Sequence, residues 1–196
     1  MEIQCQCGKF CARLKAFPNN TPGRLVCYCN DCQAYLHHLK REDLLDPNGG
    51  TEVIPAYPAD VEIVRGQEHL KCTRLSPRGM FRFSTSCCNT PTANLRPNAP
   101  WAGFLRCAYA ADDAQQLDQT LGPVRSRVMG RYAKGTPPEG TPQTFNLKAF
   151  ATVVPFMLKG MLLRKSKPSP FFAQNGVTPV VTPHVLDEAD RQALYQ

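Results

Sequence analysis

The chain has 196 residues, 42% of them hydrophobic and 20% charged, with a formal net charge of +7 at pH 7. This length suits one domain that buries its own core, and the composition excludes an intrinsically disordered chain. The most apolar run, residues 149–163, contains Pro155, Lys159 and Gly160 and is shorter than the ~20 apolar residues of a transmembrane span. We therefore expect a soluble protein without a transmembrane segment, in which this run forms a buried or surface-associated helix.

Residues 1–111 alternate short apolar runs with turn formers, a pattern typical of a small antiparallel β fold. Residues 34–41 suit one or two helical turns, and the stretch 89–103, rich in proline and asparagine, is expected to be a loop. Strands are expected at 2–10, at 24–29, within 53–66, on both sides of a turn at 76–79, and at 103–110.

The pattern changes after residue 111. A short helix is expected at 111–122, a strand at 124–133 and a helix at 147–165, and Asp187 is placed to cap a closing helix. We therefore predict a β domain over 1–111 and a C-terminal extension over 112–196 that packs on the same domain.

The sequence contains ten cysteines. Its first residues, MEIQCQCGKF, lack the basic and apolar regions of a secretory signal, so we expect a cytoplasmic protein whose thiols stay reduced. In that compartment clustered cysteines more often bind metal or do chemistry than form disulfides, and closely spaced cysteines bridge one another poorly. Outside the clusters, cysteines are expected to act as small buried hydrophobes; these are Cys11, Cys72 and Cys107.

Residues 27–32 read CYCNDC. If this segment is a strand, Cys27 and Cys29 share one face, and a turn after Cys29 can return Cys32 to them. Zinc accepts thiolate ligands in tetrahedral geometry, and three protein ligands leave the fourth position open, as in catalytic sites. We predict such an open zinc site here; His37 or His38 could be a fourth ligand or a proton carrier, or could lie on the surface of a helix.

A second site is predicted from CQCG at 5–8 and the cysteine pair at 87–88. Cys5 and Cys7 share a face if they lie on a strand, and Gly8 permits a turn after them. Two ligands cannot close a zinc site, so a distant pair is required, and Cys87 and Cys88 supply it. The expected result is a structural site with four cysteine ligands.

The motifs together resemble those of the glutathione-dependent formaldehyde-activating enzyme family, which also includes centromere protein V. That family carries an early CxCG, then CHCxxC, then an FCxxCGTP-like segment, which correspond here to CQCG at 5–8, CYCNDC at 27–32 and FSTSCCNTP at 83–91. The resemblance covers about residues 3–110. It implies an all-β arrangement of small sheets called a β-tent, a catalytic zinc in the triplet, and a structural zinc held by the CxC and the later pair.

The chain departs from the family pattern at three positions of these motifs. Tyr28 stands where histidine is common, and Asn89 stands where glycine is usual. Thr85 falls on the first cysteine of the later pair, so Cys87 is expected to replace that ligand from a neighbouring position. The C-terminal extension is longer than in short family members, so the chain resembles a divergent branch.

The resemblance implies carbon–sulfur lyase chemistry on the adduct of glutathione and an aldehyde, with a small thiol as the partner. Three thiolates make the ion a weak Lewis acid, so we expect it to bind and orient a thiol rather than to act as a strong electrophilic catalyst. The positive net charge fits an anionic substrate, and Arg125 and Arg127 could bind carboxylates from one face of a strand or form a solvated face.

The sequence also fits two non-catalytic functions. One is a zinc-stabilised binding module for nucleic acid or a protein partner, although the basic residues are spread along the chain rather than concentrated. In another, both zinc ions only hold the β scaffold together.

Overall fold

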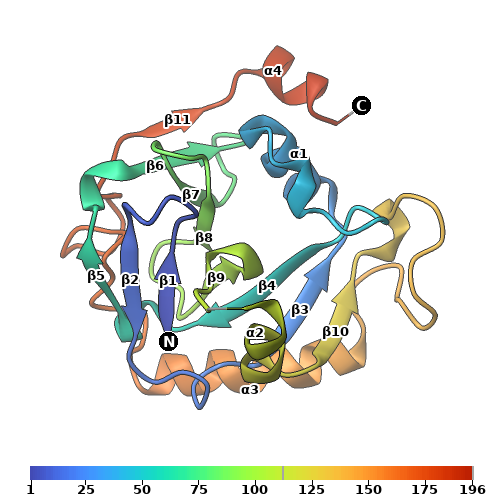
Figure 1. Cartoon of the computed structure of the whole chain (residues 1–196), viewed down its shortest axis with the longest axis horizontal. Coiled ribbons are helices and arrows are strands. Elements are labelled where there is room, and N and C mark those ends of the chain that lie inside the picture. The colour runs from blue at the N-terminus through green and yellow to red at the C-terminus, as the bar shows by residue number, and fades with distance from the viewer. Residues whose placement is uncertain (112, 196) are drawn as a thin grey trace.

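The computed structural model describes residues 1–111 and 113–195, which form a mainly β structure (Figure 1). Within these residues the strands build one sheet of three strands and one of eight. The strands are β1 (Glu2–Gln4), β2 (Cys11–Leu14), β3 (Arg24–Cys27), β4 (Thr51–Ala56), β5 (Val61–Arg65), β6 (Leu70–Arg74), β7 (Phe81–Thr85), β8 (Pro91–Leu95), β9 (Ala102–Leu105), β10 (Val124–Val128) and β11 (Pro183–Val185). The α-helices are α1 (Asn30–Leu39), α2 (Ala114–Leu121), α3 (Leu147–Leu162) and α4 (Glu188–Ala193). Short 3-10 helices lie at Glu42–Leu44, Pro58–Asp60, Gln67–His69, Arg106–Ala108 and Gly130–Tyr132.

The larger sheet is mixed. Its strand order is β10-β3-β4-β9-β8-β7-β6-β11, and the inner strands from β3 to β6 pair antiparallel. The two outer strands, β10 and β11, run parallel to their neighbours β3 and β6. The expected mainly β fold with C-terminal helices is confirmed, and the extension also supplies both edge strands of the sheet. The division of the chain at 111/112 stays a prediction.

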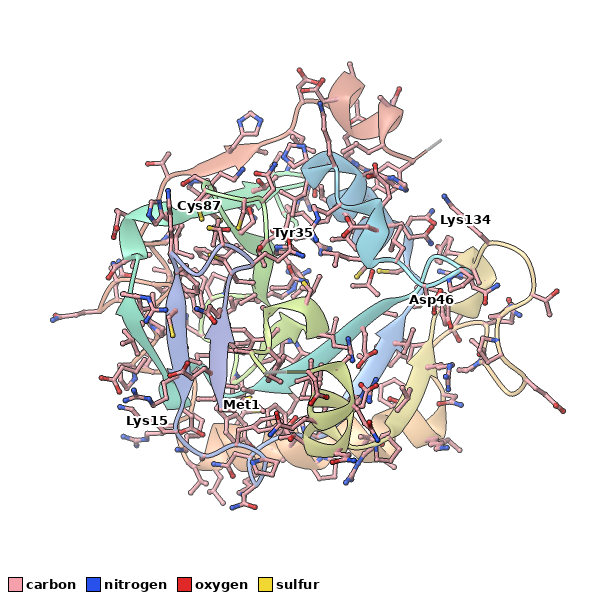
Figure 2. The ribbon with its side chains drawn as sticks, viewed as in Figure 1. Met1, Lys15, Tyr35, Asp46, Cys87 and Lys134 are labelled. Atoms are coloured by element: carbon pink, nitrogen blue, oxygen red, sulfur yellow. The ribbon has the colours of Figure 1, made fainter. Side chains whose placement is uncertain are left out.

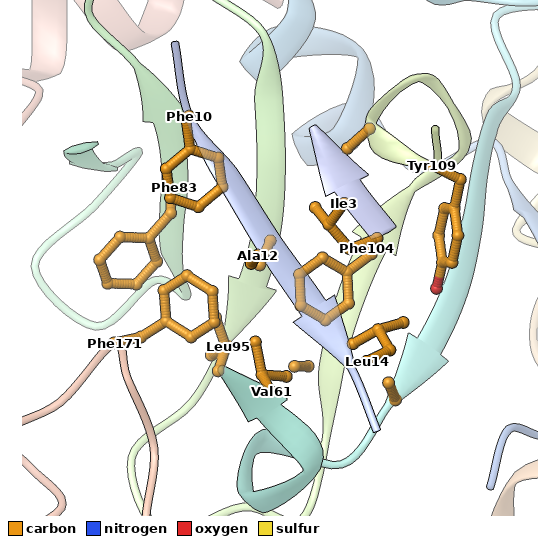
Figure 3. Packing of buried hydrophobic residues seen from close by; sticks show 14 of the residues in the cluster. Ile3, Phe10, Ala12, Leu14, Val61, Phe83, Leu95, Phe104, Tyr109 and Phe171 are labelled. Atoms are coloured by element: carbon orange, nitrogen blue, oxygen red, sulfur yellow. The ribbon is translucent and has the colours of Figure 1, made fainter. Parts of the chain in front are cut away.

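The main apolar core lies between the two sheets (Figure 3). Ile3 and Ala12 of the smaller sheet and Leu95 and Phe104 of the larger sheet are fully buried in it. Phe171 joins this core from the C-terminal part of the chain, with its ring centroid 4.9 Å from that of Phe83. The C-terminal part therefore completes the core that the strands begin.

The expectation of a loop over 89–103 is wrong, because this stretch contains β8. All five residues of β8 are buried. Pro91 occupies the first position of the strand, where the missing N–H is tolerated, and Thr92 and Asn94 face a buried polar surface rather than solvent. The polar residues and the proline of β8 therefore gave the sequence pattern of a loop, although the segment is a central strand.

The helices predicted after residue 111 are confirmed. Asn146 caps α3 by accepting a hydrogen bond from the Ala149 N–H, and Asp187 caps α4 by accepting one from the Asp190 N–H. Within the described residues, no helix combines the length and the apolar character that crossing a membrane requires.

Candidate metal centres

The cysteine triplet lies where β3 gives way to α1. Cys27 is the last residue of β3, Cys29 is the N-cap of α1, and Cys32 lies in the first turn of that helix. Their three Sγ atoms all lie within 4.8 Å of one another. The residues therefore converge as predicted, but through a helix N-terminus rather than along one strand. Such a helix end favours anionic ligands.

The three thiols interact strongly with one another. Hydrogen bonds with Cys29 and Cys32, together with burial, raise the pKa of Cys27 well above its usual value. The pKa of Cys32 is lowered well below its usual value, because Cys27 and Cys29 hydrogen-bond to its thiolate and Arg82 lies beside it. A divalent cation that replaced the shared protons would stabilise all three sulfurs as thiolates.

The second cluster brings together four cysteines from distant parts of the chain. Cys5, Cys7, Cys87 and Cys88 have Sγ atoms that all lie within 4.8 Å of one another. The Sγ of Cys5 is 3.6 Å from that of Cys7 and 3.7 Å from that of Cys87, and the sulfurs of Cys87 and Cys88 are 3.8 Å apart. A tetrahedral zinc with bonds of about 2.3 Å requires sulfur–sulfur edges of about 3.8 Å, whereas a disulfide bond measures about 2.05 Å. The spacing fits a four-sulfur metal site.

The N-terminal half of this cluster is a turn rather than the expected strand, because β1 ends at Gln4. The Gly8 N–H donates to the Cys5 carbonyl at 2.9 Å, and Gly8 adopts a φ of 75°. The Phe10 N–H donates to Cys5 Sγ at 3.2 Å. A turn of this kind points both cysteine side chains to one side and gives one sulfur a backbone donor.

The other half of the cluster follows β7; Cys87 is labelled in Figure 2. Asn89 has a φ of 51°, in the left-handed region that asparagine tolerates better than most residues, so it can form a turn here without glycine. Thr85 lies against Cys88, with Oγ1 and Sγ 3.5 Å apart. Burial raises the pKa of Cys88, but hydrogen bonds from Thr90 and Thr85 outweigh this and lower it to about 5. Both adjacent cysteines thus belong to the cluster.

Arg82 is a residue of the triplet site that the sequence did not indicate. It lies on β7, its side chain is only 3% exposed, and its guanidinium lies 5.3 Å from the ring centroid of Tyr35 on α1. Its charge lowers the pKa of Cys32, and Asp31 forms a long ion pair with it at 3.8 Å. Because side chains alternate along a strand, Arg82 points to the face of the sheet opposite that of the core residues Phe81 and Phe83. Such a face normally meets solvent, but here α1 covers it.

Other polar groups are buried on the same face. Asn94 on β8 lies opposite Arg82 in the strand register. Ser84 lies on β7, two residues after Arg82, and so faces the same side of the sheet. Tyr35, labelled in Figure 2, lies beside Ser84. Among the described residues, Asn94 Oδ1 has no hydrogen-bond partner, and the Tyr35 and Ser84 hydroxyls have none other than each other. Leaving such a group unsatisfied costs about 1–3 kcal/mol, so these atoms call for water or a ligand.

The predicted anion-binding arginines lie on β10, as expected. Arg125 is exposed and lines a cavity of about 380 Å³ together with Asn20 and Lys159. Arg127 lies beside the hydroxyl of Tyr28, the residue between Cys27 and Cys29 in the sequence. Whether either arginine holds a substrate stays a prediction.

The histidines after the triplet are engaged elsewhere. His37 Nδ1 lies 3.2 Å from Glu42 Oε1, and the ring of His38 stacks on that of His184 with centroids 6.3 Å apart. Neither belongs to the group of candidate ligand atoms at the triplet in the described residues.

Comparisons with known proteins add a family but no activity. A family model described as "Family of unknown function (DUF6151)" matches residues 1–182. The chain is similar to a crystal structure of a Rhodobacter sphaeroides protein, a structural genomics target, with 19% sequence identity over 63% of this chain and 97% of that one. The TM-score of this match is 0.42. Among curated proteins there is no match.

Proposed function

The chain belongs to the family of unknown function DUF6151, and for this member we propose a zinc-binding protein that takes a small thiol at the cysteine triplet. The thiol class is glutathione or its aldehyde adduct, by resemblance to enzymes that act on such adducts. The observation that carries the proposal is the contrast between the clusters: four cysteine sulfurs converge in one, and three in the other.

This contrast separates a closed site from an open one. Four cysteines complete a tetrahedral zinc site, so the cluster of Cys5, Cys7, Cys87 and Cys88 suits a structural ion. At the triplet, the candidate ligand atoms among the described residues number three. Zinc bound there would offer its fourth position to a substrate thiolate.

Arg82 supports an anionic ligand at this position. Three thiolates and a divalent cation carry a net charge of −1, and an added thiolate makes it −2. A buried guanidinium beside Cys32 offsets this charge where solvent cannot. Arg82 is therefore proposed as a positioning residue for the incoming thiolate.

The buried polar groups suit the rest of an adduct. When a thiol adds to an aldehyde, the sulfur–carbon bond forms and the thiol proton passes to the carbonyl oxygen; cleavage reverses both changes. Burial raises the pKa of Tyr35, so its hydroxyl stays protonated and can donate to that oxygen. Ser84 and Asn94 offer further hydrogen bonds to hydroxyl or amide groups of the ligand.

Cobalt substitution tests the proposal, because cobalt(II) reports its own coordination in the visible spectrum. Adding glutathione to cobalt-loaded protein should change the thiolate–cobalt bands, and this change should be lost in Cys29→Ser. Cys107→Ser is the matched control, since Cys107 belongs to neither cluster. Arg82→Met should weaken glutathione binding about tenfold, the effect of removing a charged hydrogen-bond donor, and Arg82→Lys should restore part of it.

Exchange NMR with glutathione and formaldehyde then separates turnover from binding. Metal-dependent acceleration of adduct exchange supports the lyase-like activity. Thiol binding without acceleration supports a binding module, and a cobalt spectrum unaffected by glutathione refutes the open site.

A further inference from the structure

The outer face of α3 is apolar along its whole length. Most of the exposed apolar positions follow one another at intervals of three or four residues, so they form one stripe on the helix. The residues of this stripe are Leu147, Phe150, Val154, Leu158, Met161 and Leu162. Leu158 is 59% and Leu162 is 84% exposed, which is unusual for such large side chains and marks the stripe as an interaction surface.

The inner face of α3 is fixed against the larger sheet, so the helix cannot rotate to hide the stripe. The ring of Phe156 stacks on that of Tyr57 with centroids 4.1 Å apart, and the Tyr57 hydroxyl donates to the Phe156 carbonyl at 2.8 Å. Gly160 also packs against Tyr57. Figure 1 shows α3 running along one side of the molecule. The exposed stripe is therefore a property of the fold.

The charged residues on α3 and in the segments that flank it in the chain have one sign. The sequence contains no aspartate or glutamate between Glu139 and Asp187. The basic residues in that interval are Lys148, Lys159, Arg164, Lys165 and Lys167. Lys165 is paired with Asp60 at 2.5 Å, and the other four are exposed. The stripe is thus accompanied by four exposed basic side chains, which form its cationic border.

We propose that α3 binds the surface of an anionic lipid bilayer, with its axis in the plane of the interface. An interfacial helix buries its apolar face among the acyl chains and places Lys and Arg at the anionic headgroups, which is the pattern of α3 and its border. A second copy of the chain would bring two cationic borders together. Nucleic acid would match the charge but would leave the stripe without an apolar partner. The inference does not depend on the metal sites.

Trp101 provides a built-in reporter of this surface. It is the chain's single tryptophan and lies in a cavity of about 260 Å³ beside α3, with Val153 and Met157. Its ring centroid is 6.0 Å from that of Phe156 on the buried face of the helix. Trp101 is half-buried at the flank of α3, so lipid that covers this flank should shift its emission to shorter wavelength.

The test is sedimentation of the full chain with phosphatidylcholine vesicles, with and without phosphatidylserine, alongside Trp101 fluorescence. We expect binding to the phosphatidylserine vesicles that weakens as salt rises. Leu158→Gln and Leu162→Gln should each lower partitioning about tenfold. Arg164→Gln and Lys167→Gln should each lower it about fivefold.

The matched control is Val64→Gln, which removes an apolar side chain that is 46% exposed on β5 and should leave partitioning unchanged. Thermal unfolding of each variant confirms that it is folded. No binding to phosphatidylserine vesicles would overturn the proposal. So would binding that is insensitive to the leucine variants, or a stable dimer that these variants dissociate without any vesicle binding.

Discussion

Replacing Cys87 by serine should destabilise the protein far more than the same change at Cys29. A metal in the four-cysteine cluster would join Cys5 to Cys87, which are 82 positions apart in the chain. A cross-link that closes a loop of that length stabilises a fold by about 4.5 kcal/mol. The triplet closes only the segment 27–32, for which the same relation gives about 2 kcal/mol.

The assay combines metal analysis with denaturant unfolding. Each of the two variants should lose one of two bound zinc ions. The free energy of unfolding should fall by about 4.5 kcal/mol in Cys87→Ser and by about 2 kcal/mol in Cys29→Ser. Because small proteins are stable by only about 5–15 kcal/mol, the first loss approaches global unfolding. Cys107→Ser makes the same chemical change outside both clusters and should keep both ions.

Two results would refute this reasoning. Equal destabilisation by the two ligand variants would mean that the four-cysteine cluster does not tie distant segments together. A Cys87→Ser protein that retains two ions at unchanged stability would mean that Cys87 is not a ligand, despite its sulfur lying 3.7 Å from that of Cys5.

Three further changes test other contacts of the fold and the turn after Cys88. Gly160→Ala should cost about 1–3 kcal/mol, because its new Cβ would lie 2.5 Å from Tyr57 Cε1; denaturant unfolding measures this. Asp118→Asn should be less stable than wild type at neutral pH, because a hydrogen bond from Arg106 lowers the pKa of Asp118. That stabilisation is present above the ordinary value of 3.8 and is lost as pH falls through the lowered pKa, so unfolding curves of the two proteins should converge in acid. Asn89→Ala should cost about 1–2 kcal/mol, since alanine is strained at a φ of 51°, and it should also weaken metal binding at Cys88 in a chelator competition.

The local β pattern could be predicted, whereas the order of strands could not. The alternation around the turn at 76–79 correctly predicted β6 and β7, because each strand reports its own buried face. That β10 pairs with β3 and β11 with β6 depends on contacts between distant segments, which leave no periodic signal in either strand. The parallel pairing of the two edge strands therefore could not be predicted from the sequence.

The cysteine groups could be predicted for a different reason. Thiol spacing constrains which residues share an ion almost independently of the backbone between them, so the groups were identified although two local expectations failed. Cys29 begins a helix instead of continuing a strand, and Cys7 lies in a turn. Both arrangements let neighbouring side chains converge, which is the property that the spacing requires.

The burial of Arg82 beside the triplet could not be predicted from the sequence. On its strand it alternates with two phenylalanines, and by sequence alone such a position belongs to a solvated face. Because α1 covers it, the guanidinium is buried, and an unpaired charge there would cost several kcal/mol. The partners on that side are the long contact with Asp31 and the thiol of Cys32, so the arginine is best compensated when the triplet carries negative charge. Three thiolates around a divalent cation carry −1, and the guanidinium of Arg82 beside Cys32 compensates this charge.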